Sequence, residues 1–145
     1  AVLTIFFPML MNTGGNAGGQ SSVAIIRAMS LGEITMKNFF RVLWKEFRVS
    51  ILCGVSLAVA CFVKIILIDG LLLKTPGVNN NVALVVALTL CLTVICAKFI
   101  GCVLPIIAKK MKLDPAVMAS PFITTIVDAL SLLIYFMIAK AILHI

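Results

Sequence analysis

The chain has few charged residues: Asp, Glu, Lys and Arg make up 12% of its 145 residues, whereas hydrophobic side chains make up 63%. Soluble domains carry about 25% charged residues, so this composition excludes an ordinary soluble fold. The chain also lacks the alternation of polar and apolar residues that membrane β-strands show. Its apolar runs reach the roughly 20 residues that a helix needs to cross a bilayer core. The sequence therefore predicts an all-α, polytopic helical membrane protein.

Other absences exclude further classes of protein. The five cysteines form no C-x-x-C pair and none is near the single histidine, His144, so we expect neither a zinc site nor a disulfide framework. The net charge of +7 comes from basic residues between the apolar runs, with no basic stripe interleaved with aromatics, so nucleic acid is not an expected partner. The chain starts at Ala1 inside an apolar run, without an initiating Met or a charged leader, and we interpret it as a fragment of a longer protein.

Four apolar stretches predict four membrane spans in one transmembrane domain that covers residues 1–145. The predicted spans are residues 1–30, 49–73, 82–108 and 116–143. Between the first two, large apolar side chains recur at helical spacing among basic ones, which predicts an interfacial amphipathic helix at residues 35–48. Its expected anchors to lipid headgroups are Trp44, Arg41 and Lys45. A docking site for a protein partner is the less favoured alternative for this segment.

The basic residues predict the orientation of the spans. The first and third connections contain eight of the Lys and Arg residues, whereas the second connection contains only Lys74. By the positive-inside rule, the first and third connections are cytoplasmic, and the second connection and both ends of the chain are external. Because an external start is unusual, we expect at least one more membrane helix upstream.

The first predicted span contains an unusual polar run, P-M-L-M-N-T-G-G-N-A-G-G-Q-S-S, at residues 8–22. Asn12, Asn16 and Gln20 are spaced by four, so on a helix they share one side, where polar side chains cannot face lipid. Two overlapping G-x-x-x-G pairs favour close helix packing and consist of Gly14, Gly15, Gly18 and Gly19. Packing explains the glycines but not the three carboxamides, so we favour a polar pathway over packing alone.

The last predicted span contains two aspartates. Asp114 stands before Pro115, a pattern typical of a helix start, so its role is predicted to be structural. Asp128 lies about 20 Å further along a helix, where inserting a charge costs about 2.5–3.5 kcal/mol. Spacings of three and four predict a polar stripe on the same face, formed by Ser120, Thr124, Ser131 and Tyr135. We therefore favour ion contact for Asp128, with a protonated carboxyl or a salt bridge to Lys64 or Lys98 as the alternatives.

These two segments resemble the MgtE family of magnesium transporters and channels. The family signature P-x-x-x-G-T-G-G-N-x-G-x-Q appears here as Pro8 with residues 12–20, and its D-P-A…P…T-T…D-x-x-x-L-L-I-Y segment appears as residues 114–135. The sequence R-V-L-W-K-E at residues 41–46 also looks familial, and the resemblance covers essentially the whole chain.

The resemblance implies a multi-pass protein of the prokaryotic plasma membrane, a homodimer with five membrane helices per protomer and cytosolic regulatory domains outside this chain. It also implies a pore on the dimer axis, where a pair of aspartates contacts hydrated Mg²⁺. Asp128 matches that aspartate, Asn16 a pore-facing asparagine, and Thr124 a position whose backbone helps to line the ion site. We therefore take Asp128, Asn16 and Thr124 as candidate metal contacts. The further pore-lining candidates are Asn12, Gln20, Thr125 and Ser131.

Two departures from the family pattern put ion preference in question. The first glycine of the motif is Asn12 here, and a glycine often found three residues after the aspartate is Ser131. Passive transport of Mg²⁺ is the predicted function, with Mn²⁺, Ca²⁺ or Co²⁺ as other ions for the same site. The alternatives are a carrier of another divalent cation and a membrane-embedded assembly module without transport. An intramembrane enzyme is not expected, because only Asp128 is central and His144 is terminal.

Overall fold

The computed structural model describes residues 2–35, 37–118 and 121–143, and these ranges contain helices and no strands. A short 3₁₀ helix, η1 (Val2–Phe6), leads into α1 (Phe7–Ser30). The long helix α2 (Phe39–Lys64) continues directly into a π-helix, η2 (Ile65–Leu72). After α3 (Asn80–Lys110) come a 3₁₀ turn, η3 (Pro115–Met118), and the last helix, α4 (Pro121–Leu143). The predicted all-α helical class is confirmed.

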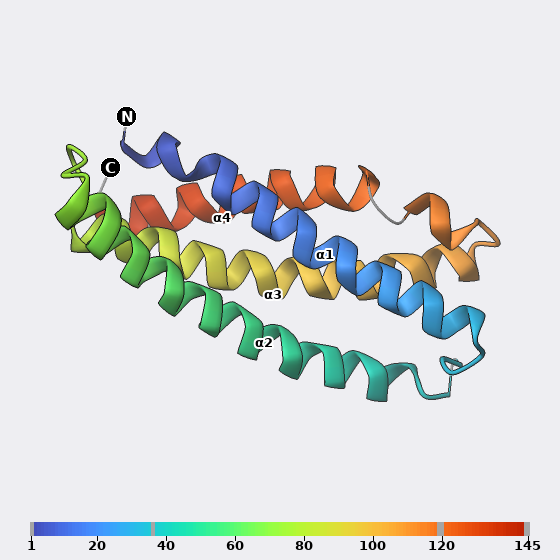
Figure 1. Ribbon diagram of the computed structural model, residues 1–145. Helices are drawn as coiled ribbons and strands as arrows, with labels where there is room; N and C mark the ends of the chain where they lie inside the picture. The colour runs from blue at the N-terminus through green and yellow to red at the C-terminus, as the bar shows by residue number, and fades with distance from the viewer. Residues whose placement is uncertain (1, 36, 119–120, 144–145) are drawn as a thin grey trace.

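Helix α3 is the centre of the bundle. It packs against α1, α2 and α4, while α1 packs against α4 as well (Figure 1). Most of its core-facing side chains are small or β-branched, and Ala83, Val85, Val86, Val94 and Ala97 are completely buried. Because such side chains let neighbouring helices approach closely, α3 can contact three partners at once.

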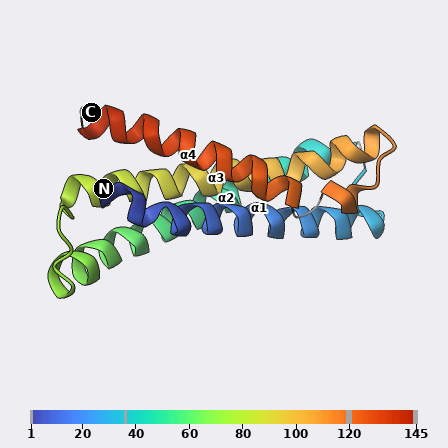
Figure 2. The ribbon, with the colours of Figure 1, turned by 90° about the horizontal axis from the view of Figure 1, so that it is seen from above.

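The connections lie at the two ends of the bundle as the sequence predicts. The chain start, the end of α4 and the α2–α3 connection lie at one end, and the α1–α2 and α3–α4 connections lie at the other (Figures 1 and 2). Most basic residues therefore gather at the second end, which we call the basic end. Which side of a membrane this end faces stays a prediction from the positive-inside rule.

Within the described ranges, three helices are long and apolar enough to cross a membrane: Phe39–Leu72, Asn80–Lys110 and Pro121–Leu143. The predicted first span is also a helix, α1, with 24 residues or about 36 Å of length. Its Asn, Gln, Ser, Thr and Gly residues make it too polar to qualify by composition. The four predicted spans thus become three apolar helices and one long helix with a polar side.

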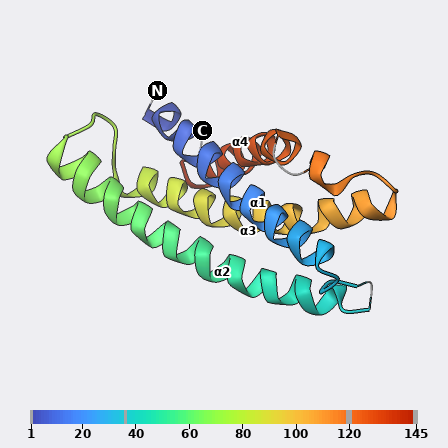
Figure 3. The ribbon, with the colours of Figure 1, turned by 45° about the vertical axis from the view of Figure 1, so that its right-hand side comes forward.

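The prediction of a separate interfacial helix at residues 35–48 is wrong. Helix α2 begins at Phe39 and runs without a break through the predicted boundary (Figure 3). This segment contains no proline, so the amphipathic pattern simply forms the first turns of a longer helix. Trp44, Arg41 and Lys45 are exposed there, and Trp44 stacks on Phe47 with 5.9 Å between ring centroids. Their anchoring to headgroups remains a prediction.

Residue 116, the predicted start of the last span, lies in the short η3, and α4 is described from Pro121. Asp114 does act as a cap, because its Oδ1 accepts a hydrogen bond of 2.9 Å from the Ala116 N–H, but the helix it caps is the short η3. Proline is favoured in the first turn of a helix, where its missing N–H needs no partner, and Pro121 is the first residue of α4.

Candidate functional site

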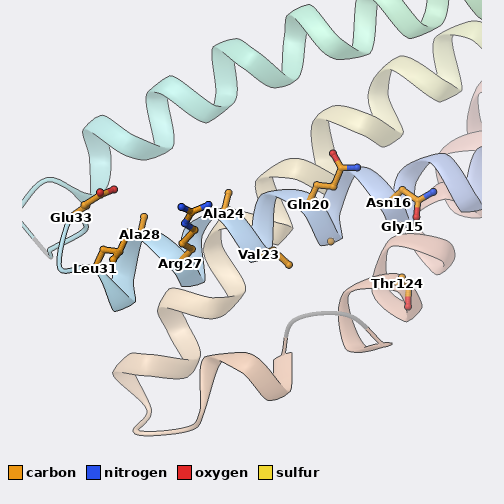
Figure 4. A pocket seen from close by; sticks show the side chains of 11 residues that line it. Gly15, Asn16, Gln20, Val23, Ala24, Arg27, Ala28, Leu31, Glu33 and Thr124 are labelled. Carbon is orange, nitrogen blue, oxygen red and sulfur yellow. The ribbon is translucent and has the colours of Figure 1, made fainter.

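Two hollows that lie end to end between α1 and α4 form what we call the α1–α4 groove. One has a volume of about 480 Å³ and is lined by Phe7, Pro8, Met11, Asn12, Gly15, Asn16, Thr124 and Asp128. The other, of about 750 Å³, shares Gly15, Asn16 and Thr124 and extends past Gln20 to Arg27 and Glu33. Figure 4 shows Asn16, Gln20 and Arg27 following one another along α1, with Thr124 opposite on α4. The groove therefore runs from the start of α1 to the basic end.

The three candidate metal contacts come together in the smaller hollow. Asp128 and Thr124 lie one turn apart on α4, and Asn16 faces the same space from α1. Asn12 joins them, and its Oδ1 accepts a hydrogen bond of 3.4 Å from the Asn16 Nδ2. One carboxylate and two carboxamides thus border one open space.

Close packing of α1 sets the position of this groove. A Cβ atom on Gly14 would lie 2.6 Å from the Thr93 Cγ2, and one on Gly18 would lie 3.0 Å from the Ala97 carbonyl oxygen, both on α3. On the side facing α4, a Cβ atom on Gly15 would lie 3.1 Å from the Thr124 Cγ2. These glycines therefore allow α1 to lie against both neighbours.

Gly19 differs from the other three glycines. A Cβ atom there would meet no atom within 4 Å, and Gly19 lines the larger hollow of the groove. The predicted packing role is wrong for Gly19 within this chain. The two G-x-x-x-G pairs lie on different sides of α1. Gly14 and Gly18 lie on the packed side, whereas Gly15 and Gly19 border the groove, where only Gly15 comes close to α4.

The predicted polar stripe on α4 divides between two faces. Ser131 is 1% exposed and donates a hydrogen bond of 2.6 Å to the Val127 carbonyl oxygen. Tyr135 is completely buried and its hydroxyl donates to the Leu3 carbonyl oxygen at 3.0 Å. Both belong to the buried face of α4, which repeats every four residues from Ile123. The prediction that Ser131 lines the pathway is therefore wrong, as is the place of Tyr135 in the stripe.

One other candidate on α4, Thr125, falls outside the groove. Thr125 is exposed and its Oγ1 donates to the Pro121 carbonyl oxygen at 2.9 Å, but it lines neither hollow. Ser120 lies outside the described residues. The groove side of α4 is thus marked by Thr124 and Asp128, which are four positions apart.

The lysines that could neutralise Asp128 are paired elsewhere. The Lys64 Nζ lies 2.6 Å from the Asp69 Oδ2, and the Lys98 Nζ lies 3.8 Å from the Glu46 Oε2. Within the described ranges no Lys or Arg nitrogen comes within 4.0 Å of the Asp128 carboxylate. The alternative of a salt bridge from Asp128 to Lys64 or Lys98 is therefore contradicted.

Sequence reasoning missed both of these carboxylate partners. Asp69 follows Lys64 by five residues, a spacing that suits the wider turn of a π-helix and not that of an α-helix. Glu46 lies in the segment predicted to be a separate interfacial helix. A contact between this segment and Lys98 of α3 was therefore not expected. The i to i+5 spacing of opposite charges inside an apolar run is the signal that could have identified the first pair.

A site built by one chain suits a hydrated ion better than a bare one. Among the described residues, no group of three or more His, Cys, Asp and Glu side chains comes together. Asp128 offers one carboxylate, and Asn12 and Asn16 add oxygens that accept hydrogen bonds from water. Such a set can contact the water shell of a cation that dehydrates reluctantly, as Mg²⁺ does.

Comparisons with known proteins identify the family of this chain. A family model described as divalent cation transporter, MgtE, matches residues 7–138. The chain is 40% identical over 142 residues to the magnesium transporter MgtE of Bacillus subtilis and 34% identical over 142 residues to that of Thermus thermophilus, covering 98% of this chain and 30% of each relative. The corresponding transporter of Enterococcus faecalis is 29% identical over 140 residues, with 97% of this chain and 29% of that protein covered. The chain thus spans about a third of the length of these relatives, and it belongs to the MgtE family of divalent cation transporters.

Proposed function

We propose that this chain forms half of a pore in which hydrated Mg²⁺ moves passively past Asp128, with Asn16 and Thr124 at the same site. The observation that carries the proposal is an open carboxylate on an apolar helix, facing two carboxamides and unpaired with the lysines of the described chain. An ionisable residue within a membrane helix is costly, so it is retained where a partner compensates it. The names of the relatives support Mg²⁺ as that partner.

A homodimer supplies what one chain lacks. The α1–α4 groove is open, with Asn12, Asn16 and Gln20 exposed along α1. Polar side chains at membrane depth need protein or water in front of them, because lipid cannot satisfy them. A second copy related by a two-fold axis would enclose the groove and bring two Asp128 carboxylates to one divalent ion.

The chemistry of Mg²⁺ fits two carboxylates and few other ligands. Mg²⁺ holds a near-octahedral shell of oxygens tightly, so a pathway can recognise the shell without removing it. Two carboxylates balance the 2+ charge, while the Asn16 carboxamide and the backbone near Thr124 accept hydrogen bonds from the coordinated water. The driving force is the membrane potential, which provides about 4.6 kcal/mol per 100 mV for a doubly charged ion, twice the single-charge value.

The pore lies in a cell membrane. The chain is a multi-pass protein of the prokaryotic plasma membrane that binds no nucleic acid and catalyses no reaction. Cytosolic regulatory domains of the full-length protein control it. Other divalent cations, Mn²⁺, Ca²⁺ and Co²⁺, compete at the same site. Their flux relative to that of Mg²⁺ measures the selectivity of the site.

Mg²⁺ flux in liposomes reconstituted with the full chain tests the proposal. Asp128→Asn removes the charge at nearly constant shape, and charges 4 Å apart at an effective dielectric of about 20 interact by about 4 kcal/mol, so we expect flux to fall by at least roughly a hundredfold. Asp114→Asn is the matched control, because asparagine also caps helix starts, and its flux should stay within about twofold. Normal Mg²⁺ flux through Asp128→Asn or Asp128→Ala would refute the assignment.

A further inference from the structure

A separate hollow of about 540 Å³ lies at the basic end and shares no lining residue with the α1–α4 groove. It lies between the end of α1, the start of α2 and the last turns of α3. Its walls are mainly apolar, formed by Met29, Ile34, Phe39 and Ile106, and its other lining residues are Gly32, Thr35, Lys109 and Lys110. None of these residues lines the groove, so the hollow is unexplained by cation transport.

The walls of this hollow are held in place by the backbone. At the end of α1, the Glu33 N–H donates to the Ala28 carbonyl oxygen at 2.9 Å and the Gly32 N–H donates to the Met29 carbonyl oxygen at 3.2 Å. These two bonds form a Schellman motif, which suits Gly32 because its φ is +74°. The hollow is therefore bordered by a fixed helix end.

The loop beyond this helix end is fixed as well. The Asn38 Nδ2 donates to the Glu33 carbonyl oxygen at 2.7 Å, and the Asn38 Oδ1 accepts from the Thr35 N–H at 2.8 Å. One side chain thus ties both ends of the turn that carries Ile34 and Thr35. Because this wall is already ordered, a ligand that binds against it spends little free energy on ordering the protein.

The position and charge of the hollow match the headgroup region of a bilayer. Phe39 begins one helix that is long and apolar enough to cross a membrane, and Lys110 ends another, so the hollow lies beside the ends of both helices at the basic end. Among the described residues, its lining contains two ammonium groups and no carboxylate. Basic pockets between membrane helices, with apolar walls continuing toward the bilayer, suit lipids with anionic headgroups.

We infer that this hollow binds one anionic phospholipid. The lipid phosphate lies beside Lys109 and Lys110, and the upper part of an acyl chain covers Ile106 and Phe39. A free phosphate would use the two lysines but leave the apolar walls in water, so the walls favour a lipid source for the same anion. The favourable effect of lysines in the last turn of a helix accounts for their charge, but not for an apolar hollow beside them.

Native mass spectrometry of the full chain, with phosphatidylglycerol and phosphatidylcholine added at equal amounts, tests the inference. The wild type should retain phosphatidylglycerol at least about fivefold over phosphatidylcholine, and Lys109→Gln with Lys110→Gln should reduce this preference to near one. Lys37→Gln is the matched control, because Lys37 is exposed at the same end but does not line the hollow. It should retain the wild-type preference.

A second variant tests the apolar walls. Ile106→Trp narrows the apolar part of the hollow without changing charge, so it should lower phosphatidylglycerol retention at least about threefold, and circular dichroism checks that the helices remain. Two results would overturn the inference: an unchanged lipid preference in the double lysine variant, or an equal loss in Lys37→Gln. Inorganic phosphate that displaces phosphatidylglycerol at equal concentration would assign the site to free anions, and an unaltered lipid count in Ile106→Trp would place the lipid elsewhere.

Discussion

Asp69 and Asp128 are both aspartates within apolar helices, but they have opposite surroundings. Asp69 is 9% exposed and its carboxylate binds the Lys64 ammonium at 2.6 and 2.9 Å. Asp128 is partly exposed, borders an open groove and has no such partner in the described chain. A carboxylate in a membrane helix therefore indicates function when the chain itself leaves its charge uncompensated.

After the loss of the Asp128 charge itself, the largest effect is expected at Asn16, whose carboxamide borders the same hollow. Asn16→Leu keeps the helix and the approximate volume but removes the group that accepts a hydrogen bond from hydrated Mg²⁺. A hydrogen bond to a charged group contributes about 1.5–3 kcal/mol, so we expect Mg²⁺ flux to fall by roughly tenfold or more. The liposome assay measures this, and a leucine variant that conducts normally would remove Asn16 from the pathway.

A second test asks whether the groove side of α1 is open. Gly14→Ala places a methyl group 2.6 Å from the Thr93 Cγ2 and 2.9 Å from the Val127 Cγ1, and overpacking of this kind costs about 1–3 kcal/mol. Gly19→Ala meets no atom within 4 Å, so its folding stability should stay unchanged or rise by up to about 1 kcal/mol. Unfolding in detergent micelles measures both. Equal destabilisation of the two variants would contradict the assignment of packed and open sides.

The smallest effect is expected at the paired aspartate. Asp69→Asn leaves Lys64 without its carboxylate, but the Lys64 side chain is 45% exposed and can reach water, so we expect a loss of about 1 kcal/mol. Mg²⁺ flux per folded protein should stay within about twofold of the wild type. In a Lys64→Gln background the same substitution should cost less, since the pair is already broken. A large loss of flux in Asp69→Asn with intact folding would show that Asp69, like Asp128, takes part in transport.

Much of this arrangement could be predicted from residue spacing. Helical class, the order of the connections and the shared side of Asn12 and Asn16 follow from helical periodicity and from the cost of polar groups in lipid. That Asn16 and Asp128 belong to one site is what the resemblance to the MgtE family implies. The glycine spacing also predicts close packing, which holds for Gly14 and Gly18. The residue spacing within one helix thus predicts which side chains share a face of that helix.

Spacing could not show which face meets which neighbour. Ser131 and Thr124 both belong to the predicted stripe, but packing of α4 on α1 and α3 buries Ser131 and leaves Thr124 at the groove. The Lys64–Asp69 pair escaped notice because the π-helix shifts the register by one residue. Such details depend on how helices pack together and on local changes in helix geometry.

Anomalous scattering from Mn²⁺, used as a probe for Mg²⁺ in crystals of the full chain, would locate the ion relative to Asp128. We expect a peak between two copies of the chain at about 4–5 Å from each Asp128 carboxylate, a distance that leaves one water between metal and oxygen. The peak should disappear in Asp128→Asn and remain in Asp69→Asn. A peak that survives in Asp128→Asn, or one located beside Asp69, would show that Asp128 does not hold the ion.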